Sequence, residues 1–140
     1  MAAILLRVAE AVRPGVSAEA LDALARNLVA EEGDAPSFLN YQAKGDKKKF
    51  PATLCVSVND EVVHGLPTAD KVLRDGDIVS IDLGLRHRGL YTDAALTLAG
   101  GAVGTVEEKL IAVTKQALAR AVYAARVGAT VGDIGFAVES

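Results

Sequence analysis

The spacing of apolar residues predicts two helices at the start of the chain. Across residues 4–12, apolar side chains recur every three or four positions, as one face of a helix requires. Pro14-Gly15 is expected to stop this helix. Ser17 is suited to cap a second helix, whose apolar stripe covers residues 21–29 and ends before Gly33.

The middle of the chain predicts a sheet that follows an irregular segment. Residues 34–53 show no periodicity, and the run Lys47-Lys48-Lys49 inside them is interpreted as a solvated loop tip, with anion binding as the alternative. Residues 54–63 are expected to form a strand, a bend at Asn59-Asp60 and a second strand. Residues 78–98 predict a β-hairpin.

Helices are expected again after the hairpin. The pattern from Thr105 to Glu108 is typical of a capping box, and the helix that it opens is expected to end at Gly128. Thr130 is suited to cap one more helix. The element order predicts an α+β fold in which helices cover an antiparallel, hairpin-rich sheet. Without a repeat or a linker, residues 1–140 are expected to form one domain.

Composition excludes several classes of protein. With 15 basic and 18 acidic residues the net charge is −3, which argues against a nucleic-acid partner. No apolar run approaches the roughly 20 residues of a membrane helix, so no membrane partner is expected. The single cysteine, Cys55, rules out an intramolecular disulfide. A cytoplasmic protein is the expectation.

Two aspartates on the predicted hairpin carry the main chemical signal. Strand alternation places Asp82 on one face and Asp93 on the same face of the partner strand. If the turn is centred between His87 and Arg88, the two carboxylates lie directly opposite each other. Opposed like charges destabilise a sheet, so we expect a shared proton, an intervening basic side chain or a divalent cation. No basic residue alternates onto this face, which favours the cation; a hydrated surface face is the alternative.

One further residue is a candidate for the site, and two others with reactive side chains are not. His64 follows an apolar strand and could act as a metal ligand, a proton donor or a substrate contact, or it could be a solvated loop residue. His87, at the charged hairpin tip, is expected to be solvated. Cys55 lies in an apolar strand and is expected in the core rather than as a nucleophile.

Several motifs in order resemble one known family. The stretches FPATLCVSVNDEVVHGLP and LRDGDIVSIDLGLRHRGLYTDAALTLAGG resemble the type I methionine aminopeptidases, which have the pita-bread fold. The flanking helical segments fit the same pattern, so the resemblance covers nearly the whole chain. It implies a partial domain of peptidase family M24, corresponding to about the first half of the fold.

The resemblance implies a metal centre. It makes Asp93 a bridging ligand of two divalent ions (Co, Mn, Fe or Zn) and Asp82 a chelating ligand of one. His64 would contact the substrate near the scissile peptide nitrogen. The family's other ligands, a His and two Glu, would lie beyond Ser140, so the isolated chain is expected to be inactive or nearly so.

A substrate pocket is implied as well. Tyr41, Phe50 and Cys55 match positions that line the pocket for the methionine side chain, and Asn59 matches a residue whose backbone helps to bind a monovalent cation. The implied function is removal of methionine from nascent polypeptide N-termini, with the missing half or another chain as a possible partner. The alternatives are a prolidase-like Xaa-Pro peptidase, and a non-catalytic binding module or fragment.

Overall fold

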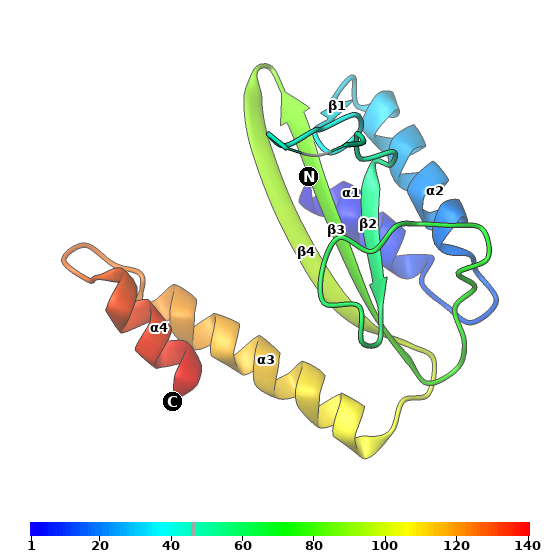
Figure 1. Cartoon of the computed structure of the whole chain (residues 1–140). Coiled ribbons are helices and arrows are strands. Elements are labelled where there is room, and N and C mark those ends of the chain that lie inside the picture. The colour runs from blue at the N-terminus through cyan, green and yellow to red at the C-terminus, as the bar shows by residue number, and fades with distance from the viewer. Residues whose placement is uncertain (46) are drawn as a thin grey trace. The chain divides into compact units, whose positions relative to one another are not determined.

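The computed structural model describes residues 1–45 and 47–140, which form two compact units, Met1–Val103 and Gly104–Ser140. Figure 1 shows the elements of both units. The first unit contains, in order, α1 (Ala2–Glu10), α2 (Ala18–Glu31), β1 (Ala35–Pro36), β2 (Leu54–Val58), β3 (Asp77–His87) and β4 (Leu90–Gly100). The second contains α3 (Thr105–Ala124) and α4 (Val131–Glu139).

The two N-terminal helices form as the apolar spacing predicts. The Ser17 hydroxyl accepts a hydrogen bond from the Ala20 N–H at 3.2 Å, which confirms the expected cap of α2. Helix α1 ends at Glu10, before the predicted stop. Pro14 explains the early end, because a proline disfavours helical backbone at the residue before it and cannot donate to the helical ladder.

Strand β3 is the centre of a four-stranded antiparallel sheet. It pairs with β4 along one edge, and with β2 and β1 along the other. Helices α1 and α2 cover one face of this sheet (Figure 1). The core between the helices and the sheet contains Val8, Leu21, Leu28, Val29, Leu54, Val56, Val79, Ile81, Leu83 and Leu85. The predicted α+β architecture, with helices over an antiparallel sheet, is confirmed.

The predicted register of the hairpin is wrong by two residues. The turn is centred on Arg88 and Gly89, whose φ angles are 48° and 87°, because a two-residue hairpin turn of the I′ type needs positive φ at both positions. Asp82 therefore pairs with Ala95, and Asp93 pairs with Gly84. A shift of two keeps the side chains on the predicted face, so the aspartates are diagonal neighbours.

Two other predicted elements need correction. β2 ends at Val58, where Asn59 turns the chain with a φ of 56°, and residues 61–63 form no second strand. The N-cap of α3 is Gly104, without a side-chain hydrogen bond, so Thr105 does not form the predicted capping box. The reciprocal box occurs at the start of α4 instead, between Thr130 and Asp133.

The end of α3 also differs from the expectation. It ends at Ala124, before Gly128. In this second unit, the Arg126 guanidinium lies over the Tyr123 ring, 4.3 Å from its centroid. Among the helices described, none is long and apolar enough to cross a membrane.

A buried carboxylate joins α2 to the start of β2. Asp22 Oδ1 accepts hydrogen bonds from the backbone N–H groups of Thr53, at 2.7 Å, and Leu54, at 2.8 Å. Its other oxygen accepts from Arg26 at 3.0 Å. The residue is 7% exposed, so these contacts satisfy buried amides that water does not reach.

We therefore expect Asp22→Ala to destabilise the protein by ~2–3 kcal/mol, since it leaves two buried donors without an acceptor. Asp22→Asn, which keeps one acceptor oxygen, should lose less. Urea unfolding of the full chain measures both. Glu10→Ala, an exposed helical acid, is the control and should change stability by no more than about 0.5 kcal/mol. Equal stability of Asp22→Ala and wild type would show that the contact does not stabilise the fold.

Candidate metal and substrate site

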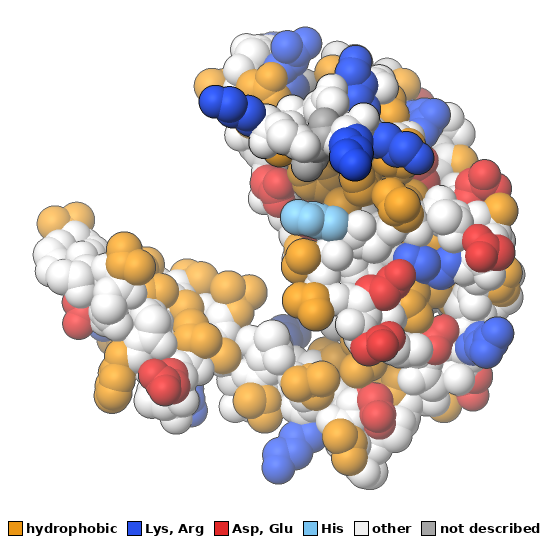
Figure 2. Space-filling model, viewed as in Figure 1, with side chains coloured by type: hydrophobic (Ala, Val, Ile, Leu, Met, Phe, Trp, Pro, Cys, Tyr) orange, Lys and Arg blue, Asp and Glu red, His pale blue; other side chains and the backbone are white. Residues whose placement is uncertain are grey.

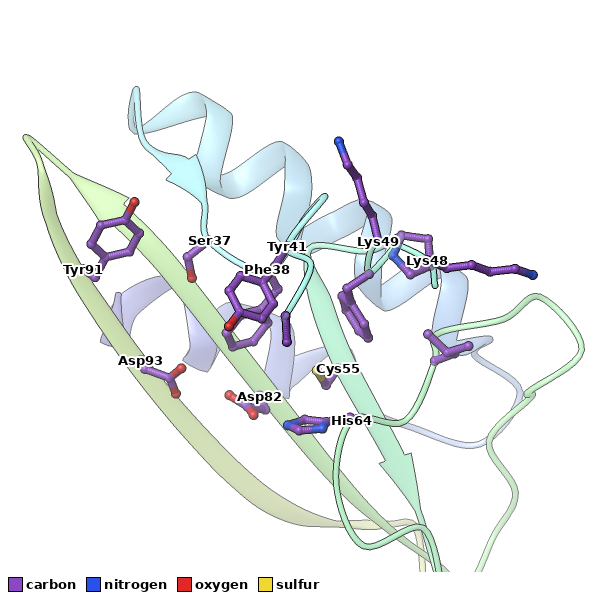
Figure 3. Close-up of a pocket in the computed structure, with 14 residues that line it drawn as sticks. Ser37, Phe38, Tyr41, Lys48, Lys49, Cys55, His64, Asp82, Tyr91 and Asp93 are labelled. Atoms are coloured by element: carbon purple, nitrogen blue, oxygen red, sulfur yellow. The ribbon is translucent and has the colours of Figure 1, made fainter. Parts of the chain in front are cut away.

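A cavity of about 880 Å³ lies on the sheet face that α1 and α2 leave open. Its floor is formed by Asp82 of β3 and Asp93 of β4, with Cys55 of β2 beside them. Figure 3 shows both carboxylates and His64 directed toward this common space. The irregular segment between β1 and β2 forms the opposite wall, so the cavity joins residues from four parts of the sequence.

The floor of the cavity carries an unbalanced negative charge. Asp82 Oδ1 is buried and accepts no hydrogen bond from any residue that the structure describes. Burial raises the pKa of the Asp82 carboxyl, and the nearby Asp93 carboxylate raises it further. A buried acceptor without a donor, next to a second carboxylate, is an environment that a cation stabilises.

The donor set fits a divalent ion but does not complete a site for one. Carboxylate oxygens are ligands for hard and borderline divalent metals. Within residues 1–45 and 47–140, no group of three or more His, Cys, Asp or Glu side chains is arranged to hold a metal. Metal sites in proteins usually use at least three protein ligands. Asp82 and Asp93 thus offer two of the donor groups that such a site needs.

Close backbone packing places His64 at the mouth of the cavity. The Val56 N–H donates to the Gly65 carbonyl at 2.9 Å, and the Gly65 N–H donates to the Ser57 hydroxyl at 3.1 Å. A Cβ at Gly65 would collide with the Val56 carbonyl oxygen, so glycine is needed for this approach. His64 itself has a φ of 58° and stays exposed, which leaves its ring accessible to a ligand.

A lysine holds the other end of the same loop. The Lys71 ammonium donates to the Val56 carbonyl at 3.1 Å and forms an ion pair with Glu61 at 2.7 Å. Together, Lys71 and Gly65 give hydrogen-bond partners to the backbone of Val56 at the outer edge of β2. The loop that carries His64 is therefore attached to the sheet on both sides of the histidine.

Aromatic rings form the apolar wall. Phe38 and Phe50 meet edge to face, with centroids 6.5 Å apart and ring planes at 89°. Gly84 allows this packing, because a Cβ there would collide with the Ser37 hydroxyl and the Phe38 ring. The Ser37 N–H also donates to the Gly84 carbonyl at 3.0 Å. The glycine opposite Asp93 thus lets the wall approach the carboxylates.

Cys55 is buried beside the floor, as predicted for a core residue. Burial, with the negative charges of Asp82, Asp93 and Asp22, raises the pKa of its thiol to about 12. It is therefore a neutral thiol at physiological pH and a poor nucleophile, which makes it a soft, apolar part of the wall.

The cavity brings together nearly all the residues singled out from the sequence. Those that line it are Tyr41, Phe50, Cys55, His64, Asp82 and Asp93. Asn59 does not: its side chain accepts from the Ile78 N–H and donates to Asp77, each at 2.9 Å. His87 is exposed as expected, but its ring also contacts the Asp34 carboxylate at 2.6 Å.

The sequence reasoning missed Phe38 and Tyr91 as lining residues. Tyr91 alternates with Asp93 along β4, so strand periodicity could have indicated it. No local pattern marks Phe38, because its position depends on the space left by Gly84 on a distant strand.

The site combines a carboxylate pair on an antiparallel hairpin, an apolar wall and a histidine, His64, at its mouth. This arrangement is suited to a metal-dependent enzyme. The chain belongs to metallopeptidase family M24, whose model matches residues 1–140. It is 44% identical to a methionine aminopeptidase of Aquifex aeolicus over 99% of this chain and 54% of that protein. The chain thus spans about half the length of this curated relative.

Solved structures agree with this assignment. A methionine aminopeptidase of Thermotoga maritima superposes with a TM-score of 0.90 and 34% identity, over 97% of this chain and 52% of that one. The predicted pita-bread fold is confirmed. An X-Pro aminopeptidase of Thermotoga maritima matches with a TM-score of 0.73 at 18% identity, over 97% of this chain and 35% of that one, and shows the fold alone.

The packing at Gly84 can be tested directly. Gly84→Ala should destabilise the protein by about 1–3 kcal/mol, because the added methyl group forces Ser37 and Phe38 away from β3. Urea unfolding measures the loss, and NMR shifts of the Phe38 and Phe50 rings report the displaced wall. Gly135→Ala on α4, where a Cβ meets open space, is the matched control and should be neutral or slightly stabilising. Unchanged ring shifts in Gly84→Ala would contradict the packing described.

Proposed function

We propose that this chain supplies part of the active site of a metal-dependent aminopeptidase that removes the N-terminal methionine of nascent polypeptides. The observation that carries the proposal is the buried, unpartnered oxygen of Asp82 beside Asp93, at the floor of an apolar-walled cavity. The similarity to methionine aminopeptidases over the whole chain supports the same function.

In this proposal Asp82 and Asp93 would hold the divalent ions, and Asp93 would be a ligand shared between two of them. Co, Mn, Fe and Zn all suit carboxylate and imidazole donors. When bound, such ions polarise the scissile carbonyl and lower the pKa of a water molecule. In this proposal the free N-terminal amine of an incoming polypeptide lies at the same floor.

The walls provide orientation. His64, exposed at the mouth, donates a hydrogen bond near the scissile peptide nitrogen. Phe50, Tyr41 and the neutral Cys55 thiol flank the methionine side chain, since aromatic and sulfur-bearing surfaces suit a thioether. Asn59 is proposed as a monovalent-cation position through its backbone oxygen, because its side chain is engaged by Asp77 and Ile78.

The remaining ligands must come from polypeptide outside residues 1–140. By the family resemblance they are a histidine and two glutamates, carried by the second half of the fold or by another chain. Exposed apolar residues on α3 support such a partner, since Leu110, Leu118 and Val122 are 58%, 64% and 66% exposed. The proposed location is the cytoplasm, where new N-termini arise; neither nucleic acid nor a membrane has a role in the proposal.

Metal binding tests the role of the carboxylates. Calorimetric titration of the full chain with Mn²⁺ should show weak binding, which falls at least about tenfold in Asp93→Asn and in Asp82→Asn. Asp60→Asn, an exposed turn residue, is the matched control and should bind as wild type does. Equal losses in Asp60→Asn, or none at Asp82 and Asp93, would contradict the assignment.

Activity tests the incompleteness of the site. The chain alone, with added Mn²⁺ or Co²⁺, should release no methionine from a Met-Ala-Ser peptide, because two carboxylates do not complete the ligand set. Robust turnover by residues 1–140 would show that the ligand set is complete without further polypeptide.

A further inference from the structure

Four lysines lie in one short segment beside the cavity and have no role in the proposed chemistry. Lys44, Lys47, Lys48 and Lys49, here called the basic rim, all lie in the segment between Tyr41 and Phe50 and are exposed. Lys48 and Lys49 line the same cavity as the carboxylates. Figure 3 shows their side chains extending outward from the wall, and Figure 2 shows basic side chains above a histidine on one face of the first unit.

The charges of the basic rim are not neutralised within the described part of the chain. The ion pairs found there involve Arg7, Arg26, Lys71 and His87, and none includes a rim lysine. The chain as a whole is acidic, with a net charge of −3, so a general excess of basic residues does not account for this local cluster of lysines. Among the described residues, no carboxylate competes with an external anion for the rim.

The base of the segment is fixed next to the cavity. The Asn40 N–H donates to the Phe50 carbonyl and the Phe50 N–H donates to the Tyr41 carbonyl, each at 2.8 Å. The Phe50 ring packs on Phe38 in the wall. Because these contacts anchor the end of the segment that follows the lysines, the rim is held over the mouth of the cavity.

The cavity thus has two ends of opposite charge: carboxylates on the floor and ammonium groups at the rim. In the chain without bound ions, a ligand that matches both ends carries a positive group inside and a negative group outside. A polypeptide has this polarity when its N-terminal amine enters the cavity and acidic side chains follow. A nucleic acid fits less well, because its phosphates would approach the same two carboxylates.

We propose that the basic rim is a specificity determinant that selects polypeptides with acidic side chains shortly after the N-terminal residue. This inference rests on the proposed function, because that function places the polypeptide amine at the floor. An extended chain advances about 3.3 Å per residue, so the residues that follow the first pass the rim as they leave the cavity.

The test uses the full chain, labelled with ¹⁵N, and NMR titration to millimolar peptide. The two amidated probes are Met-Ala-Glu-Glu-Ala and Met-Ala-Gln-Gln-Ala. The acidic probe should bind about threefold to tenfold more tightly at low salt, and the preference should fall as ionic strength rises. The triple variant K47Q/K48Q/K49Q should remove the preference, whereas K109Q/K115Q/R120Q on α3, with the same change in charge, should keep it.

Equal affinities for the two probes, no binding of either, or loss of the preference in the α3 variant would overturn the proposal. So would tighter, rim-dependent binding of a single-stranded hexanucleotide, which would assign the rim to nucleic acid. Acetylated forms of both probes separate this inference from the proposed function. If acetylation leaves the affinity unchanged while the preference for Glu persists, the result supports the role of the rim and contradicts binding of the amine at the floor. If acetylation weakens binding but the peptides with Glu and Gln bind equally, the result supports binding of the amine and contradicts the role of the rim.

Discussion

The repulsion between two carboxylates on one face of a hairpin is the constraint on which the rest of this site depends. Asp82 and Asp93 sit on neighbouring strands, and one Asp82 oxygen is buried without a partner among the described residues. The pKa of Asp82 is raised for the same reason, since burial and the second carboxylate both oppose its ionisation. Such a pair is costly for folding, so a cation is the ligand that the site is best suited to accept.

The surrounding structure keeps this pair in a fixed place. Helices α1 and α2 pack on the opposite face of the sheet, while the face that carries the aspartates stays open. Two glycines then allow backbone to approach: Gly84 accommodates the aromatic wall, and Gly65 brings the loop of His64 against β2. Asp22 joins α2 to the start of β2 and so links the covered face to the strand that carries Cys55.

Strand alternation was enough to predict which side chains share the open face, because the side-chain period of two survives any even shift in pairing. The exact register was not predictable in this way. It is set by positive φ angles at Arg88 and Gly89, and arginine gives no signal for that conformation. The helix predictions were wrong only at the helix ends; for example, Gly104 rather than Thr105 caps α3.

The irregular wall was the least predictable part, and the reason is physical. Its residues have no periodicity, and their positions depend on contacts with distant strands, such as Ser37 with Gly84. The run of lysines illustrates the consequence. Its composition predicts a solvated loop, and the side chains are indeed exposed, yet the hydrogen bonds of Phe50 with Asn40 and Tyr41 fix its base in the cavity wall. Where a run of charged residues lies is decided by the packing of the residues that anchor it, and the run itself carries no information about that packing.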